Sequence, residues 1–247
     1  MTKIAIIGGT GLTTLNGLEI TGREIIQTPF GEPSGPLVSG VLSGQKIFFL
    51  PRHGAGHTIP PHKINYRANI WALKEAGVEQ IIAINAVGGI RSDMQPGTLI
   101  IPDQIIDYTW SRTNSFFEEG LTQVVHIDFT YPFCEMLRQN IISAADKNSI
   151  MLVKEGTYAA TQGPRLETAA EIKKLEKDGC DLVGMTCMPE AALAKEKELC
   201  YASISVVANL AAGKGTEDLT MDIIEKNLNQ GMSQVRNLLE VVIPGLD

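Results

Sequence analysis

A carboxylate and a side-chain amide, Glu167 and Asn209, carry the hydrogen-bonding groups that a 6-oxopurine ring requires. Glu167 stands in the run Thr161–Thr168, and Asn209 follows the apolar stretch Cys200–Ala208. An ionised glutamate accepts a hydrogen bond, which suits the ring N1–H, while an asparagine can both donate and accept at the O6 and N7 edge. Neutral adenine has no N1–H. The two residues therefore predict a 6-oxopurine pocket in which both act as catalytic and base-binding groups.

Two other segments have the residue types of a phosphate site. The run Gly8–Gly11 follows a short apolar stretch, so its backbone amides and the Thr10 hydroxyl can approach an anion. Arg52 and His53 follow another apolar stretch, and the arginine fork matches two phosphate oxygens. A plain turn explains the glycine run equally well, and a surface salt bridge is the alternative for Arg52. The glycine spacing is not the GxGxxG of a dinucleotide site.

Further candidate contacts lie where predicted strands end. Asn85 and Ala86 close the run Gln80–Ile84, so the backbone at Ala86 could meet a phosphate or a ring face; the simpler interpretation is a strand-to-loop turn. Thr186 has a hydroxyl that can donate to phosphate. Met185 is a soft, adaptable side chain that can pack beneath a sugar.

The histidines do not have the pattern of a metal site. His53, His57 and His62 are close in sequence, but Pro60-Pro61 interrupts them, so a helix cannot present them as paired ligands. No cysteine or carboxylate lies among them, and we expect no metal. His126 stands alone near apolar residues, where a structural role is the simpler interpretation.

The bulk composition is that of a globular enzyme. The 247 residues are 44% hydrophobic and carry a net charge of −7 without a basic block, which argues against a nucleic-acid surface. No apolar run is long enough to span a membrane, and the pattern of a signal peptide is absent from the N-terminus. The cysteines form no CxxC pair, so we expect reduced thiols and a cytoplasmic location. They are Cys134, Cys180, Cys187 and Cys200.

Short β-branched runs alternate with helical patterns along the chain, which is typical of a layered α/β domain. No linker or repeat divides it, so we expect one domain over residues 1–247. Ser111–Val124 has neither pattern and is expected to be a loop. The predicted strands are Lys3–Ile7, Leu37–Leu42, Lys46–Leu50, Gln80–Ile84, Thr98–Ile101, Leu182–Val183 and Cys200–Ala208. The predicted helices are Ile64–Ala76, Phe133–Ala145, Thr168–Lys177, Glu190–Lys197 and Met221–Val242.

Several motifs in a fixed order resemble those of the trimeric purine nucleoside phosphorylases, in the branch that contains methylthioadenosine phosphorylase. The resemblance covers nearly the whole chain. It implies a three-layer α/β/α fold with a central mixed, partly barrel-like sheet, and a homotrimer with active sites near the subunit contacts. The motifs are Gly8–Gly11, Thr28–Gly31, Arg52–Gly54, Asn65–Asn69, Asn85–Gly89, Gln162–Arg165 and Met188–Glu190.

The same resemblance implies the reaction and the role of each candidate residue. The reaction is phosphorolysis, in which inorganic phosphate is a co-substrate and no cofactor is required. Met185 is expected to lie against the ribose, and His126 to reach the sugar pocket of a neighbouring subunit. His53 is expected to take part in catalysis as well as in binding. The phosphate-binding residues that the resemblance implies are Thr10, Arg52, His53, Ala86 and Thr186.

The chain departs from the methylthioadenosine branch at the base and at the 5′-group. That branch reads a 6-aminopurine with an Asp-x-Asp pair, whereas this chain has Asn209-Leu210-Ala211, and Glu167 replaces a small hydroxyl residue. Both changes predict a 6-oxopurine. Met221 and Ile224 are three residues apart near the expected 5′-pocket, where inosine phosphorylases place a histidine. They predict an apolar slot for a methylthio group; the alternative is that both are core residues of an amphipathic helix.

The expected partners are therefore a small nucleoside and phosphate, with no nucleic acid and no membrane. The favoured substrate is a 5′-methylthio 6-oxopurine nucleoside. A general inosine/guanosine phosphorylase and a methylthioadenosine phosphorylase are the nearest alternatives. From other classes, an NAD-binding oxidoreductase lacks its fingerprint here, and a nucleoside-binding module without activity would release no base.

Overall fold

One mixed sheet of ten strands runs through the computed structural model, which describes residues 3–9, 12, 15–215 and 221–246 and the side chains of these except residues 221–225. The strand order is β2-β3-β4-β1-β5-β9-β8-β7, with β10 pairing β5 and the short β6 pairing β10. The strands are β1 (Ile4–Gly8), β2 (Glu19–Glu24), β3 (Leu37–Leu42), β4 (Gln45–Pro51), β5 (Gln80–Gly89), β6 (Leu99–Ile100), β7 (Gln104–Asp107), β8 (Thr157–Ala160), β9 (Leu182–Gly184) and β10 (Cys200–Leu210).

Strand β5 is the centre of this sheet, and the sheet opens beside it. Along one edge, β1 pairs with β5 in parallel as far as Ala83, and β9 pairs with it in antiparallel from Gly88 onward. The residues between Ala83 and Gly88 have no strand neighbour on that side. On the other edge, β10 follows β5 in parallel along its whole length. The gap beside β5 is where the candidate site forms.

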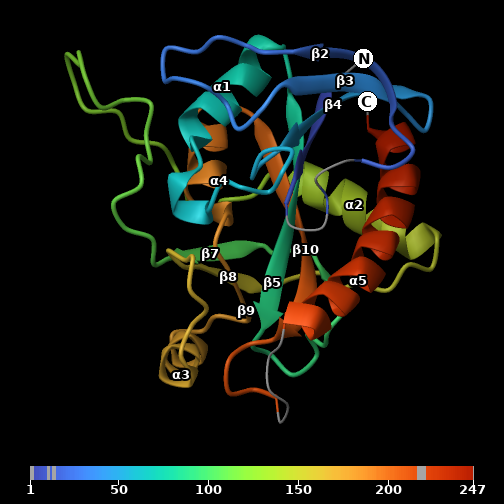
Figure 1. The fold of residues 1–247 in the computed structure, drawn as a ribbon. Helices are drawn as coiled ribbons and strands as arrows, with labels where there is room; N and C mark the ends of the chain where they lie inside the picture. Colours follow the sequence, from blue (N-terminus) through green and yellow to red (C-terminus); the bar gives the residue numbers. More distant parts are fainter. Residues whose placement is uncertain (1–2, 10–11, 13–14, 216–220, 247) are drawn as a thin grey trace.

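Helices cover both faces of the sheet (Figure 1). Helices α2 and α5 pack on one face and α1 and α4 on the other. Adjacent residues of β1 alternate between the two cores, Ile4 and Ile6 joining α2 and α5 while Ala5 and Ile7 join α1 and α4. The helices are α1 (Tyr66–Glu75), α2 (Glu135–Lys147), α3 (Ala169–Lys177), α4 (Cys187–Glu196) and α5 (Met221–Val242), with single 3₁₀ turns at η1 (Pro61–Lys63) and η2 (Ile243–Gly245). The expected central mixed sheet between helical layers is confirmed.

Most predicted elements are present with ends shifted by a few residues, but four strands differ, among them β7, which was not predicted. Strand β5 runs to Gly89 instead of ending at Ile84, because its polar and glycine residues pair with β10 and β9. Strands β2 and β8 were not predicted; β2 lies at the edge of the sheet and is almost wholly exposed, so it lacks an apolar alternation. The expected loop Ser111–Val124 is confirmed, since no helix or strand lies between β7 and α2.

The expectation of four reduced thiols is wrong for two of them. Cys134 and Cys200 form a disulfide with a Cα–Cα distance of 5.1 Å, and Cys180 and Cys187 are free and buried. The bridge joins the start of α2 to the start of β10, where the Cys134 amide also donates to the Tyr201 carbonyl at 2.8 Å. The two cysteines are 66 residues apart, so their approach follows from helix packing that spacing does not reveal. Among the described helices, none has the length and hydropathy to cross a membrane.

Helix α5 depends on a glycine for its packing on β10. A Cβ at Gly231 would lie well inside contact distance of Cγ1 of the buried Val206. Alanine in a helix interior is ordinarily favoured over glycine by up to about 1 kcal/mol, but overpacking against a stiff β-branched side chain costs about 1–3 kcal/mol. We therefore expect Gly231→Ala to lower the melting temperature.

Asn229→Ala is the matched control, because Asn229 lies on the exposed side of the same helix and gains helix propensity without a clash. Thermal unfolding of both variants measures the effect. A Gly231→Ala protein as stable as the Asn229→Ala protein would contradict the packing argument.

Candidate active site

A cavity of about 330 Å³ opens beside β5 and collects most of the residues predicted from sequence. Strands β1, β4, β5 and β10 are parallel, so their carboxyl ends reach the same edge of the sheet, where ligands bind in open α/β folds. The loop after β8 closes the cavity from the opposite side. The predicted residues that line it are Arg52, His53, Ala86, Glu167, Met185, Thr186 and Asn209.

The remaining predicted residues are not placed in this cavity. His126 is exposed in the segment between β7 and α2, which projects from the body of the molecule (Figure 1). Thr10 lies outside the described residues. Met221 begins α5, but its side chain and that of Ile224 are also outside the described part.

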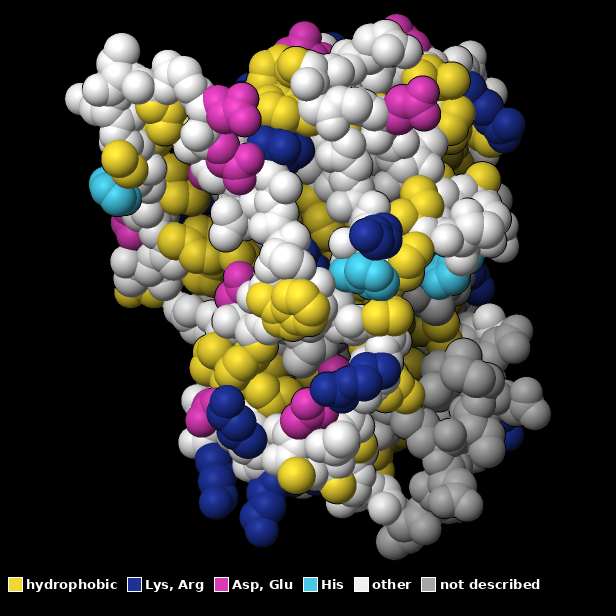
Figure 2. All heavy atoms as spheres, turned by 60° about the vertical axis from the view of Figure 1, so that its left-hand side comes forward, with side chains coloured by type: hydrophobic (Ala, Val, Ile, Leu, Met, Phe, Trp, Pro, Cys, Tyr) yellow, Lys and Arg dark blue, Asp and Glu magenta, His cyan; other side chains and the backbone are white. Residues whose placement is uncertain are grey.

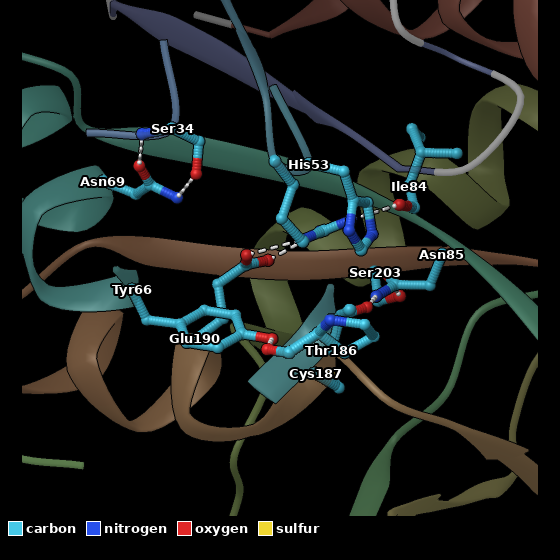
Figure 3. Close-up of polar contacts among 12 residues, drawn as sticks. Ser34, His53, Tyr66, Asn69, Ile84, Asn85, Thr186, Cys187, Glu190 and Ser203 are labelled. Atoms are coloured by element: carbon cyan, nitrogen blue, oxygen red, sulfur yellow. Dashed lines mark hydrogen bonds and ion pairs between the residues drawn. The ribbon is translucent and has the colours of Figure 1, made fainter. Parts of the chain in front are cut away.

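Arg52 enters the cavity wall as one half of a buried ion pair. Its Nε and Nη2 donate to the two carboxylate oxygens of Glu190, each at 2.7 Å, and Nη1 donates to the carbonyl oxygen of Ile84 at 2.9 Å. Both side chains are fully buried, so the surface salt bridge considered from sequence is instead an internal one (Figure 3). Tyr201 donates to the same carboxylate at 2.8 Å.

The ion pair keeps Arg52 charged. Burial acts to lower the pKa of Arg52, but the charge and hydrogen bonds of Glu190 outweigh it and raise the pKa above its ordinary value. Three of the five guanidinium N–H groups are used by Glu190 and Ile84, which fixes the plane of the guanidinium. Arg52 therefore presents a permanent and oriented positive charge at the cavity.

A buried chain of hydroxyl and amide groups orients Thr186. Ser203 Oγ donates to Asn85 Oδ1 at 2.8 Å, and Asn85 Nδ2 donates to Thr186 Oγ1 at 2.7 Å (Figure 3). The Thr186 oxygen accepts from Asn85 through a lone pair, so the hydroxyl hydrogen is not used in this contact and can donate. The end of this chain is thus a hydrogen-bond donor at the cavity wall, which suits an anion.

His53 lies beside Arg52 and is held neutral. Its Nδ1 is 2.8 Å from the carbonyl oxygen of Ile59, and a carbonyl only accepts, so Nδ1 carries the proton and Nε2 is an acceptor. Burial, with the charge of Arg52 as the second cause, lowers the pKa of His53 to about 4. At neutral pH the imidazole can accept a proton or a P–OH hydrogen bond but brings no charge of its own.

The base-reading candidates come from the loop after β8, which carries Glu167, and from the end of strand β10, which carries Asn209. Thr161 Oγ1 donates to Glu167 Oε1 at 2.7 Å, which fixes one carboxylate oxygen and leaves Oε2 for another donor. Asn209 follows a register shift in β10 after Val207, and such bulges re-aim a side chain out of the strand pattern. One N–H of Asn209 donates to the carbonyl oxygen of Leu210 at 2.7 Å.

Met185 lines the same cavity as Glu167 and Asn209. A Cβ at Gly163 would meet its sulfur at 2.5 Å, so the methionine packs directly beneath the loop that carries Glu167. Gly163 has a φ of +63°, which glycine tolerates better than other residues. Through this contact, the loop that carries Glu167 packs against the turn that contains Met185 and Thr186.

Sequence reasoning missed several residues that build the site. Glu190 and Asn85 stood in recognised motifs without an assigned role, although a glutamate among the apolar residues of Met188–Ala194 is a signal for a buried partner. Ser203 and Thr161 gave no signal, because their roles depend on contacts across the fold. Among the described residues, no group of three or more His, Cys, Asp or Glu side chains is arranged to hold a metal ion.

Comparisons with known proteins agree with this geometry. The family model described as "Phosphorylase superfamily" matches residues 3–244. The chain is 52% identical to the probable S-methyl-5′-thioinosine phosphorylase of Pseudomonas syringae pv. tomato, over 98% of this chain and 99% of the relative. It is 45% identical to the 6-oxopurine nucleoside phosphorylase of Pyrococcus furiosus, over 99% and 93%. A solved methylthioadenosine phosphorylase from Schistosoma mansoni, in complex with adenine, superposes with a TM-score of 0.94 at 36% identity, covering 100% of this chain and 93% of that one.

The buried ion pair predicts a non-additive mutant cycle. Arg52→Met or Glu190→Leu alone leaves one uncompensated buried charge, and each should lower the free energy of unfolding by about 3–5 kcal/mol. The double variant removes both charges and should lose clearly less than the sum of the singles. Urea unfolding measures all four proteins. A double variant that loses the full sum would mean that the pair contributes no mutual compensation.

The neutral His53 predicts a pH-dependent stability. Its pKa is lower in the folded state than the unfolded value of about 6.5, so unfolding takes up a proton below that pH and stability falls as pH falls toward 4. His53 alone should account for a loss of about 2 kcal/mol between pH 7 and pH 5. His53→Asn should therefore show a flatter dependence than the native protein, measured as the free energy of unfolding at both pH values. Equal slopes in the two proteins would show that His53 does not titrate as the buried geometry requires.

Proposed function

Because the chain belongs to the Phosphorylase superfamily, we propose that it catalyses phosphorolysis of S-methyl-5′-thioinosine to hypoxanthine and 5-methylthioribose 1-phosphate. A phosphate oxygen bonds to the anomeric carbon as the bond from that carbon to purine N9 breaks, and the purine leaves with the electron pair. The observation that carries the proposal is one cavity with the oriented donors Arg52 and Thr186 beside the base-reading candidates Glu167 and Asn209.

At the phosphate end, the groups differ in what they offer an incoming anion. Arg52 supplies a fixed charge, and Thr186 a donor aimed by the Asn85 amide. Neutral His53 accepts the hydrogen bond of the remaining P–OH, which leaves the other phosphate oxygens to attack. The Ala86 backbone lines the same part of the cavity. A phosphate held in this way is both the nucleophile and a negative charge next to the forming sugar cation.

At the base end, Glu167 and Asn209 act on the leaving purine. Glu167 keeps Oε2 for the N1–H because Thr161 occupies Oε1. Asn209 stabilises the charge that develops at N7 and O6 as the glycosidic bond breaks. A 6-aminopurine would place a lone pair against the Glu167 carboxylate, which disfavours it. The names of the Pseudomonas syringae and Pyrococcus furiosus relatives, both 6-oxopurine enzymes, support this choice.

The proposed 5′-selectivity is argued from the sequence positions of Met221 and Ile224 and from the names of the relatives. Four relatives that are 49–52% identical share the name probable S-methyl-5′-thioinosine phosphorylase. The general 6-oxopurine phosphorylase and the methylthioadenosine phosphorylase stay as alternatives, since both names occur among relatives at 45% identity.

Three further parts of the proposal concern assembly, cofactors and location. The chain works as a homotrimer in which His126 of the projecting segment reaches a neighbouring sugar pocket. Exposed apolar side chains on and around this segment, seen in yellow in Figure 2, support a protein contact there; they include Trp110, Leu121, Val124 and Tyr131. No cofactor takes part in the proposed reaction, and inorganic phosphate is a co-substrate. A cytoplasmic location stays a prediction, and the Cys134–Cys200 disulfide weighs against a strongly reducing compartment.

Base release from methylthioinosine, inosine and methylthioadenosine, each with and without phosphate, tests the function. We expect release only with phosphate, and roughly 10–200-fold higher kcat/KM for methylthioinosine than for inosine, the range that an apolar slot can supply. Release without phosphate would indicate a hydrolase. Equal use of inosine would establish the general phosphorylase instead.

A substitution of Glu167 tests the proposed preference for 6-oxopurines. Glu167→Gln should reduce the ratio of methylthioinosine to methylthioadenosine turnover, because an amide can also face a ring nitrogen that has no hydrogen. Glu171→Gln is the matched control: Glu171 is an exposed glutamate four residues along that pairs with Arg165. A ratio that Glu167→Gln leaves unchanged would remove Glu167 from base recognition.

A further inference from the structure

Arg112 stands at the start of the projecting segment and reaches back to the backbone of two segments that line the candidate site. Its side chain is partly buried and lies against Tyr66, with the guanidinium carbon 5.6 Å from the ring centroid. Among the described residues, no carboxylate lies within ion-pair distance of it, unlike Arg52, Arg67 or Arg91. The charge of Arg112 is instead directed at neutral oxygen atoms.

Four of those oxygens are backbone carbonyls of two separate segments. Nη1 donates to the carbonyls of Met185 and Met188, at 2.7 and 2.6 Å. Nη2 donates to the carbonyls of Thr161 and Gln162, at 3.1 and 2.7 Å. Nε donates to the Gln162 side chain at 3.2 Å. One guanidinium thus joins the loop after β8 to the turn after β9.

Both segments are irregular where Arg112 donates to their carbonyls. The loop after β8 is irregular as far as the cap of α3 at Thr168. The turn after β9 leads into α4, where Met188 has non-helical angles (φ −113°, ψ 138°) and interrupts the first turn. Buried backbone acceptors need a partner, and the planar fork of an arginine can serve several at fixed angles. At the junction of the two segments, Arg112 supplies hydrogen bonds that backbone N–H groups supply in regular secondary structure.

The two joined segments carry residues that are proposed to bind opposite ends of the substrate. The loop after β8 carries Glu167, which faces the base, and the turn after β9 carries Met185 and Thr186, which face the sugar and the phosphate. Phosphorolysis requires phosphate to meet the anomeric carbon while the base is held, so the spacing of the two segments sets the reacting distance. A displacement of about 1 Å in such a geometry can lower the rate 100-fold.

We propose that Arg112 is a positioning residue that fixes the spacing between the base-binding loop and the phosphate-binding turn. This inference rests on the proposed function. It does not require Arg112 to touch either substrate. Since Arg112 belongs to the projecting segment, it also couples the placement of that segment to the geometry of the cavity.

The test compares reaction with the binding of the separate fragments. In Arg112→Ala we expect kcat/KM for methylthioinosine to fall about 100-fold. Hypoxanthine alone and phosphate alone, each titrated by calorimetry, should bind nearly as in the native enzyme, because each half-site stays intact. A parallel loss of fragment binding and rate would overturn the proposal in favour of a general structural role. Native-like kcat/KM would overturn it as well.

One further variant keeps the test decisive if the alanine protein folds poorly, and chemical rescue of the alanine protein adds a second measurement. Arg112→Lys keeps the charge, but an ammonium lacks the planar fork and should lose most of the rate; a lysine variant with native kcat/KM contradicts the proposal. Millimolar guanidinium chloride should partly restore Arg112→Ala, and sodium chloride at equal ionic strength should not. Restoration by both salts, or by neither, counts against a specific guanidinium contact.

Arg67→Ala is the matched control, because Arg67 holds the same segment through Glu118 without touching either joined loop. It should leave the ratio of reaction to fragment binding unchanged, and a loss equal to that of Arg112→Ala would assign the effect to the segment as a whole. Native enzyme that releases no base with phosphate would instead reject the proposed function. The two failures are therefore distinguishable.

Discussion

The ion pair between Arg52 and Glu190 closes a gap that the sheet itself leaves open. Strand β1 leaves β5 after Ala83 and β9 joins it only at Gly88, so the carbonyl of Ile84 has no strand partner on that side. Arg52 donates to this carbonyl through Nη1 and to the Glu190 carboxylate through Nε and Nη2. A charge in this position requires a buried counter-charge, and α4 supplies it. The cavity exists because a side chain, and not a strand, completes the sheet at this point.

Much of the surrounding polar structure follows from that arrangement. Glu190 also accepts from Tyr201 on β10, which ties α4 to the strand that later carries Asn209. A second network, the hydrogen-bond chain from Ser203 through Asn85, orients the Thr186 hydroxyl. Both networks lie between the two apolar cores and have their hydrogen bonds largely satisfied, as low-dielectric surroundings require. They place a positive charge and an aimed donor at one cavity wall before any substrate arrives.

The proposed base-reading side combines a strand end, at Asn209 in β10, with the loop after β8 that carries Glu167. Glu167 is set by a neighbouring hydroxyl, and its loop is held against the turn after β9 by Met185 and by the carbonyl contacts of Arg112. The turns after β4 and β9 therefore carry the proposed phosphate contacts, and the loop after β8 carries part of the proposed recognition of the base. Such a division lets relatives that share a fold differ in the purine they accept, in agreement with the different names among the relatives.

The sequence by itself determined the order of the helices and of the strands other than β2, β7 and β8, together with the residue types at strand ends, because apolar periodicity is a local property that follows general rules. It therefore located Arg52, His53, Ala86, Thr186 and Asn209 near one edge. The tertiary structure alone decided which charges and which thiols meet: Arg52 and Glu190 are 138 residues apart, and the disulfide-bonded Cys134 and Cys200 are 66 apart. It also decided the burial beside Arg52 that lowers the pKa of His53, and the reach of Arg112 from a segment whose sequence indicated only a loop. Burial and partner geometry set these properties, and both arise only when distant segments pack.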